Sequence, residues 1–195
     1  MCGRYILHAE DELLRFREIM EAAHSGRDSF GGDITPGMRA LALIGGPEGP
    51  RAGALYWGLP RPGGSGLVIN ARAETLASRP MFSSSFASRR CLLPASGFYE
   101  WSRPEGRLPR RYRVFPEEGG ILYLGGVYSP VNLPGDPKPR WSFVIITLPA
   151  NGDILPIHSR MPLVIPREEQ AAWLARAPFL RPLSGFSPAF RVEAG

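Results

Sequence analysis

The second residue of the chain is a cysteine, and its position makes it a candidate nucleophile. The chain begins Met1-Cys2-Gly3-Arg4 and contains only one other cysteine, Cys91. If Met1 is removed, Cys2 becomes a 1,2-aminothiol, whose amine and thiol both react close to neutral pH. Such a pair condenses with an aldehyde to an imine, and the sulfur then closes on the same carbon to give a five-membered thiazolidine. The alternative is a dispensable residue at a mobile chain end.

Three other polar residues stand in contexts suited to proton transfer or positioning. Glu100 lies between Tyr99 and Trp101 in a predicted strand, so alternation puts it on the opposite face from both aromatic side chains. In a pocket it is a candidate general acid or base, whereas on a solvent face it is an ordinary glutamate. His158 lies in a proline-flanked loop and is either a proton shuttle or a structural residue. Asn70, at the end of an apolar strand, either orients an amine or substrate or simply forms a turn.

Metal and cofactor patterns are absent from the sequence. Its two cysteines and three histidines show no ligand spacing. There is also no phosphate loop, dinucleotide fingerprint or serine nucleophile elbow. We therefore expect no metal and no cofactor, and two free thiols in a reducing compartment.

The basic side chains are almost all arginines. The chain carries a formal net charge of +5, with 22 arginines and a single lysine, Lys138. Arginine binds phosphate through two donors at once and stacks on bases, so this bias favours a nucleic-acid partner. A coding sequence biased toward arginine would give the same composition. Charge alone does not decide between the two.

Short apolar runs between glycine and proline turns predict a protein built mainly from strands. The predicted strands cover 40–44, 53–58, 67–70, 91–101, 111–115, 121–129 and 142–147. Helices are predicted over 9–25, over 83–90, and after Pro166 with Trp173 on the buried face. We therefore expect an α+β fold, with a mostly antiparallel, curved or barrel-like β-sheet flanked by a few helices.

The length suits one domain over residues 1–195, with enough apolar content for a core. No run approaches the about 18 apolar residues that cross a bilayer. The N-terminus also lacks the pattern of a secretory signal. We therefore expect a cytoplasmic protein without a membrane partner, associated with the nucleoid when it binds DNA, and a monomer by default.

Four segments place polar residues beside glycines, prolines and aromatic residues, in order along nearly the whole chain. They are Met1-Cys2-Gly3-Arg4; Asn70-Ala71-Arg72-Ala73-Glu74; Arg90-Cys91-Leu92-Leu93-Pro94 running into Gly97-Phe98-Tyr99-Glu100-Trp101; and Ala150-Asn151 with Ile157-His158 and Arg160-Met161-Pro162. Together they resemble the SOS response-associated peptidase family. Four such segments in one order are a specific signal.

The resemblance implies a protein that loses Met1, by its own action or with help, and captures abasic sites in single-stranded DNA through Cys2. The ring-opened abasic sugar is an aldehyde, and the product would be a thiazolidine crosslink. Such a protein is a self-processing cysteine peptidase with a lyase-like crosslinking activity. By motif position the catalytic residues would be Cys2, Asn70, Glu100 and His158. The DNA-binding residues would be Arg4, Arg72, Arg90 and Arg160, with Trp57, and Tyr56 as a further candidate, stacking on bases.

Two segments depart from the family pattern. Residues 32–38 place Asp33 and Gly37 where the family carries an amide and a polar residue, and the tryptophan-rich loop after Trp57 is short in this chain.

Three other functions share some of these features. An N-terminal nucleophile amidotransferase also exposes a cysteine after Met-Cys-Gly, but it needs arginine and Asn-Gly motifs that residues 151–153 do not supply. A non-covalent reader of damaged DNA would bind without using Cys2 as a nucleophile. A peptidase acting on other proteins is the third alternative, although cleavage after Met1 requires only intramolecular proximity.

Overall fold

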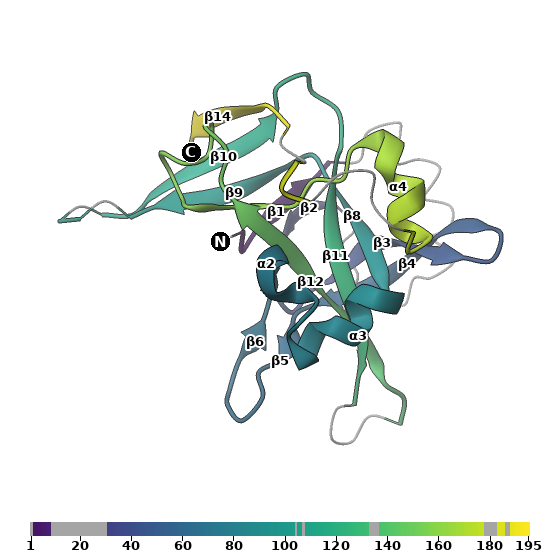
Figure 1. The fold of residues 1–195 in the computed structure, drawn as a ribbon. Helices are drawn as coiled ribbons and strands as arrows, with labels where there is room; N and C mark the ends of the chain where they lie inside the picture. Colours follow the sequence, from purple (N-terminus) through teal and green to yellow (C-terminus); the bar gives the residue numbers. More distant parts are fainter. Residues whose placement is uncertain are drawn as a thin grey trace.

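Strands are the most abundant regular elements of the computed structural model, which describes residues 2–8, 31–103, 105–106, 108–132, 137–177, 183–185 and 188–195 (Figure 1). The helix expected over 9–25 lies outside the described residues. The strands are β1 (Tyr5–Leu7), β2 (Gly32–Ile34), β3 (Arg39–Gly46), β4 (Gly49–Trp57), β5 (Leu59–Pro60), β6 (Leu67–Val68), β7 (Asn70–Arg72), β8 (Arg90–Ala95), β9 (Gly97–Ser102), β10 (Arg110–Pro116), β11 (Leu122–Val131), β12 (Arg140–Pro149), β13 (Arg160–Pro162) and β14 (Phe190–Ala194). The helices are α2 (Ala73–Leu76), α3 (Pro80–Ser88), α4 (Arg167–Leu174) and the 3-10 helix η1 (Leu183–Gly185).

Five strands close on themselves into a barrel. Their order is β11-β8-β3-β4-β12, and β12 pairs in turn with β11, which completes the ring. The pairs are antiparallel except for β12 with β4, and β7 also runs parallel to β12. The predicted α+β fold, with a mostly antiparallel barrel-like sheet and a few helices, is confirmed.

Strand β12 carries different neighbours along its two halves. Its early part borders β4 on one side, and its later part borders β7, with Ile145 opposite Asn70. The chain between β4 and β7 forms the β5–β6 hairpin, which extends from the barrel near α2 and α3 (Figure 1). Asn70 therefore begins a strand beside β12 instead of ending an apolar strand over 67–70.

Backbone geometry at one glycine fixes where the β5–β6 hairpin leaves the barrel. Gly58 has φ +114, a value that glycine adopts without strain. A Cβ at this position would also lie 3.0 Å from Cβ of Leu67, so Leu67 packs directly on the glycine backbone. Only glycine can combine this positive φ with the close contact to Leu67. The hairpin therefore leaves the barrel in a defined direction.

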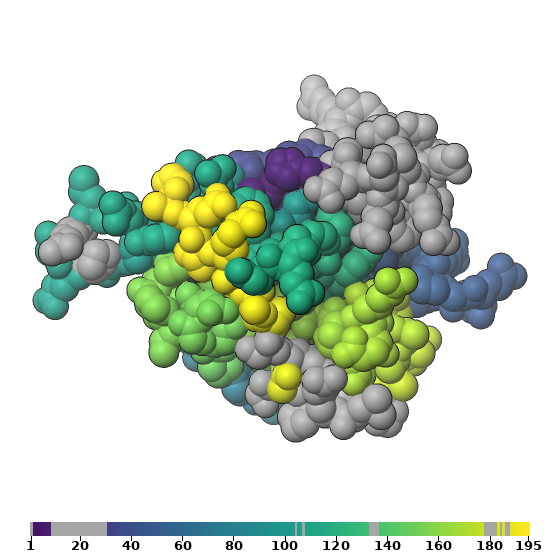
Figure 2. All heavy atoms as spheres, turned by 90° about the horizontal axis from the view of Figure 1, so that it is seen from above, coloured from purple at the N-terminus to yellow at the C-terminus, as the bar shows by residue number. Residues whose placement is uncertain are grey.

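A second sheet brings the N-terminus beside β9. It has the order β14-β10-β9-β1-β2, with Tyr5 opposite Phe98. The backbone N–H of Tyr99 donates to the carbonyl of Arg4 at 2.9 Å, which continues the pairing toward the chain start. The residues that precede β1 therefore run alongside the end of β9. Figure 2 shows β14, in yellow, on the surface of this sheet, with the β3–β4 and β9–β10 hairpins projecting on opposite sides.

Aromatic side chains and apolar strand faces fill the interior. Trp57 and Phe143, which are paired in register, stack with ring centroids 6.1 Å apart. Trp173 is fully buried and donates its indole N–H to the carbonyl of Cys91 at 2.9 Å, which attaches α4 to β8. The helix predicted after Pro166, with Trp173 on its buried face, is confirmed. Both cysteines are free thiols, as expected.

None of the helices in the described part of the chain is long and apolar enough to cross a membrane.

Candidate active site and nucleic-acid interface

Cys2 meets the start of β7 and the end of β9. The side-chain amide of Asn70 donates to the backbone carbonyl of Cys2 at 3.0 Å. The other side-chain atom of Asn70, Oδ1, is buried and has no hydrogen-bond partner among the described residues. Glu100, on β9, is only 2% exposed and lies close enough to Cys2 to act on the thiol electrostatically. Three residues that are 30 to 98 positions apart in the sequence therefore converge on one point.

The thiol of Cys2 is held in its protonated form. Burial raises the pKa of the Cys2 thiol to about 12, and the negative charge of Glu100 contributes in the same direction. Its Sγ donates to the carbonyl of Arg4 at 3.7 Å. In this environment sulfur becomes a strong nucleophile only when a base takes its proton, and Glu100 is the carboxylate beside it.

A hollow of about 570 Å³ opens beside this point. It is lined by Ile69, Asn70, Glu100, Trp101, Arg103, Ile157, His158 and Ser159. Glu100 therefore lines a pocket and is not on a solvent-exposed face. The rings of Tyr99 and Trp101 lie together, with centroids 6.2 Å apart, as strand alternation predicts, although Trp101 also borders this pocket.

His158 lines the same hollow, and a hydrogen bond to its Nδ1 holds the ring in place. The backbone N–H of Arg160 donates to Nδ1 of His158 at 2.9 Å. When the imidazole is neutral, this contact leaves the ring proton on Nε2. The turn over 151–158 supports the ring, since the N–H of His158 donates to the carbonyl of Ile154 at 2.9 Å. His158 thus combines a structural hydrogen bond with a position at the pocket wall.

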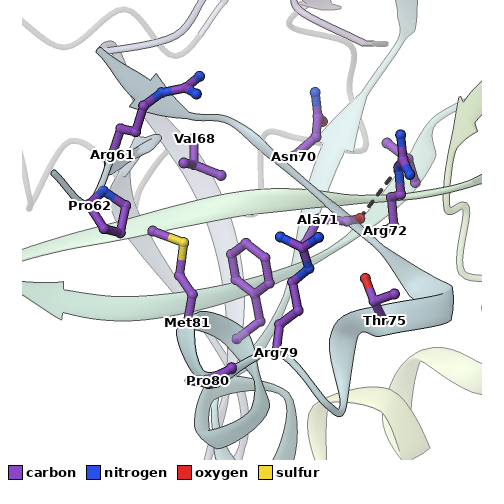
Figure 3. Close-up of a pocket in the computed structure, with 12 residues that line it drawn as sticks. Arg61, Pro62, Val68, Asn70, Ala71, Arg72, Thr75, Arg79, Pro80 and Met81 are labelled. Carbon is purple, nitrogen blue, oxygen red and sulfur yellow. Dashed lines mark hydrogen bonds between the residues drawn. The ribbon is translucent and has the colours of Figure 1, made fainter. Parts of the chain in front are cut away.

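A second hollow, of about 750 Å³, shares Asn70 with the first and contains three arginines (Figure 3). They come from three separate elements: Arg61 from the β5–β6 hairpin, Arg72 from the end of β7 and Arg79 from the residue before α3. All three are exposed, and none of the described residues that line this hollow is acidic. We call it the arginine groove. Its positive charge suits an anionic ligand, and it meets the Cys2 site at Asn70.

Trp57, expected to stack on bases, does not do so in this structure. Its side chain is fully buried between Tyr5 and Phe143. The indole N–H donates to the carbonyl of Ile69 at 3.0 Å. The expectation was wrong because the aromatic side chain lies on the inward face of β4. Trp57 instead positions the backbone immediately before Asn70. Tyr56, on the opposite face, is covered by the guanidinium of Arg140, 4.3 Å from its ring centroid.

Arg90 and Arg4, expected to bind DNA, both contact other residues of the protein. Arg90 donates to the carbonyls of Phe86 and Ala177 and lies over the rings of Phe86 and Trp173. It therefore ties α3 and α4 to the barrel, and a role in DNA binding stays a prediction. Arg4 pairs with Asp33 at 3.3 Å and lies over Tyr99, on the face of β9 away from Glu100.

Arg160 is likewise committed within the protein. Its guanidinium contacts both carboxylate oxygens of Glu74 and donates to the carbonyl of Thr147 at 2.6 Å. Its side chain is 13% exposed. A phosphate would have to compete with Glu74 for this guanidinium, so a phosphate contact of Arg160 stays a prediction, and the structure shows Arg160 in a positioning role. The pair joins α2 to β13 and fixes the segment that carries Arg72.

We predict that the Glu74–Arg160 pair makes stability depend on acid pH. The Arg160 hydrogen bond lowers the pKa of Glu74 from 4.5 to about 2. A lowered carboxyl pKa contributes stability that is complete above about 4.5 and is lost as the pH falls through about 2. Because Glu74 is 47% exposed, we expect less than about 1 kcal/mol.

Denaturant unfolding of the wild type and Glu74→Gln checks this prediction. The wild type should be the more stable protein at neutral pH, and the difference should shrink between about pH 4.5 and 2. A difference that stays constant over this range would contradict it.

Sequence reasoning missed three arginines at these hollows: Arg61, Arg79 and Arg103. None belongs to a recognisable motif, but each immediately precedes a proline. A residue before proline is restricted to extended conformations, and Arg79 has φ −79 and ψ 124. The Arg-Pro dipeptide was therefore the available signal, since it marks an arginine on extended backbone in a loop.

The described residues contain no group of three or more histidine, cysteine, aspartate or glutamate side chains placed to hold a metal ion.

Comparisons with known proteins agree with the geometry. A family model described as SOS response associated peptidase (SRAP) matches residues 1–182. The chain is 32% identical over 182 residues to the abasic site processing protein YoqW of Bacillus subtilis, covering 89% of this chain and 80% of YoqW. It is 28% identical to the abasic site processing protein YedK of Escherichia coli, covering 89% and 79%. A crystal structure of a Bacteroides thetaiotaomicron protein has the same fold, with a TM-score of 0.77 at 20% identity, covering 99% of this chain and 91% of that one.

Proposed function

This chain belongs to the SOS response associated peptidase family, and on that premise we propose that it captures abasic sites in single-stranded DNA covalently through Cys2. The observation that carries the proposal is the convergence of Cys2, Asn70 and Glu100 between a pocket and the arginine groove. A nucleophile near the chain start, a carboxylate and a basic groove are what capture of an aldehyde in DNA requires.

Removal of Met1 converts Cys2 from a peptide residue into an aminothiol. Met1 is removed either by the protein itself or by a processing enzyme. The proposed function does not include cleavage of other proteins. The new amine brings N–H donors next to Asn70, whose buried Oδ1 lacks a partner among the described residues. Satisfying that acceptor would stabilise the processed N-terminus by about 1 kcal/mol or more, because an unmet buried acceptor is costly. Asn70 would thereby orient both the carbonyl and the amine of Cys2.

The high pKa of the Cys2 thiol sets the order of the two bond-forming steps. With the sulfur protonated, the unprotonated amine attacks the aldehyde carbon first, and the resulting carbinolamine loses water to give an imine. The sulfur then adds to the imine carbon as its S–H proton leaves and the nitrogen gains a proton, so the thiazolidine forms with net loss of one water. Glu100 takes the thiol proton, and His158 exchanges protons with the oxygen that departs as water.

The arginine groove would hold the DNA that flanks the lesion. Arg72 lies two residues after Asn70 on β7, and its side chain lines the groove (Figure 3). Arginine forks bind phosphate oxygens in pairs, and they neutralise the backbone without reading sequence. The proposed substrate is therefore single-stranded DNA of any sequence that contains an aldehyde, bound by a monomer.

We predict that purified protein lacking Met1 forms a heat-stable complex with an abasic single-stranded oligonucleotide. The complex should appear as a shifted band on a denaturing gel, and an intact-base oligonucleotide of the same sequence should give none. Intact mass of the free protein establishes that Met1 is absent, and the mass of the complex should equal protein plus oligonucleotide minus one water.

A processed protein that binds the oligonucleotide without any heat-stable band would contradict covalent capture and leave a non-covalent reader of DNA damage. A processed protein that neither binds nor crosslinks would favour another N-terminal nucleophile reaction.

A further inference from the structure

One wall of the arginine groove is the β5–β6 hairpin, which follows Trp57 and stands where the family carries a longer, tryptophan-rich loop. Its turn is closed by the N–H of Arg61 donating to the carbonyl of Gly66 at 3.1 Å, and by the N–H of Gly64 donating to the carbonyl of Arg61 at 3.4 Å. A Cβ on Gly64 would lie 3.4 Å from Cδ of Arg61, so the arginine stem packs on the bare glycine backbone. The turn therefore holds the stem of the Arg61 side chain against its own backbone.

Figure 3 shows Arg61 and Arg72 on opposite sides of the hollow, with Arg79 rising from α3 between them. No hydrogen bond or ion pair engages the guanidinium of Arg61 among the described residues. The hairpin from 59 to 68 carries no aromatic residue. The hairpin would therefore bind a nucleic acid through electrostatic contacts and not through base stacking.

We infer that Arg61 is a strand-binding residue that closes the groove from the side opposite Arg72, by binding a backbone phosphate of the DNA next to the captured nucleotide. This inference rests on the proposed function for the identity of the substrate. Because the contact is to phosphate, Arg61 contributes to holding the strand before and during capture, and it takes no part in bond formation.

The test is non-covalent binding of a short, undamaged, fluorescently labelled oligothymidine to the whole protein at several salt concentrations. Arg61→Ala should weaken binding about fivefold at low salt. It should also reduce the slope of log affinity against log salt by about 0.7, the value for loss of one phosphate contact on a single strand. Arg61→Lys should keep the slope, because it keeps the charge.

Arg51→Ala is the matched control, because it removes the same charge from the exposed β3–β4 hairpin, which projects elsewhere on the molecule. It should change neither the affinity nor the slope. Equal effects of the Arg51 and Arg61 substitutions would overturn the inference, as would an unchanged slope in Arg61→Ala.

Crosslinking to an abasic oligonucleotide, measured in parallel, separates this inference from the proposed function. Arg61-dependent binding without a crosslink refutes covalent capture and supports the strand contact. If the protein crosslinks but its affinity for DNA does not change in Arg61→Ala, covalent capture is supported and the Arg61 contact is refuted. If covalent capture and the Arg61 contact are both correct, Arg61→Ala should lower the crosslinking rate at limiting DNA and leave it unchanged at saturating DNA.

Discussion

We expect Cys2→Ala to abolish the heat-stable crosslink and to leave a weaker adduct that can be trapped. The variant still presents an N-terminal amine after Met1 is removed, so it condenses with the abasic aldehyde to an imine. Without sulfur no ring can close, and the imine hydrolyses when the sample is heated. The heat-stable band should therefore disappear, and a band should return when borohydride is added to reduce the imine to a stable amine.

Cys91→Ala is the matched control for this experiment. Cys91 is the second free cysteine and is also fully buried, but it lies on β8 against Gly126. Its removal should leave the crosslink per folded molecule unchanged. A heat-stable band from the Cys2 variant would show that the bond to DNA does not use this sulfur, and the thiazolidine mechanism would be wrong. Intact mass must show that Met1 is absent from all three proteins.

The sequence predicted the elements of the fold better than it predicted which side chains are available to a partner. Alternation on β9 placed Glu100 opposite Tyr99 and Trp101, because a strand has a period of two. The apolar runs at 40–44 and 53–58, which predicted strands, lie in β3 and β4 of the barrel. Closure of the barrel depends on β12 pairing with both β4 and β11, and such long-range pairing is not a local property of the chain.

The predicted DNA contacts were less reliable, because exposure depends on tertiary packing. Trp57 and Arg90 have the residue types that bind nucleic acids, yet one fills the core and the other holds two helices. Arg160 has an acidic partner 86 positions away in the chain, which no spacing rule detects. The groove arginines Arg61 and Arg79 come together only because residues of the β5–β6 hairpin, β7 and α3 line the same hollow in the folded chain. Charge counting predicted a basic surface but could not locate it.

We expect Glu100→Gln to slow crosslinking about 100-fold without weakening DNA binding. The substitution keeps the shape of a side chain that is 2% exposed, but it removes the base that takes the thiol proton. Loss of a positioned general base costs about 100-fold or more. The measurement is the first-order rate of crosslink formation at saturating abasic oligonucleotide, with the affinity for undamaged DNA measured separately. Glu100→Asp should recover part of the rate.

The sign of the change separates this role from a purely electrostatic one. The negative charge of Glu100 helps to raise the pKa of the Cys2 thiol, so its removal alone would lower that pKa. A neighbour that acted only through its charge would therefore give faster ring closure in Glu100→Gln, and a general base gives slower closure. Glu193→Gln is the control, since Glu193 lies on β14 of the same sheet and pairs with Arg113 at 3.6 Å. An equal loss of rate in both variants would point to disruption of the sheet, and a faster Glu100→Gln would remove Glu100 from proton transfer.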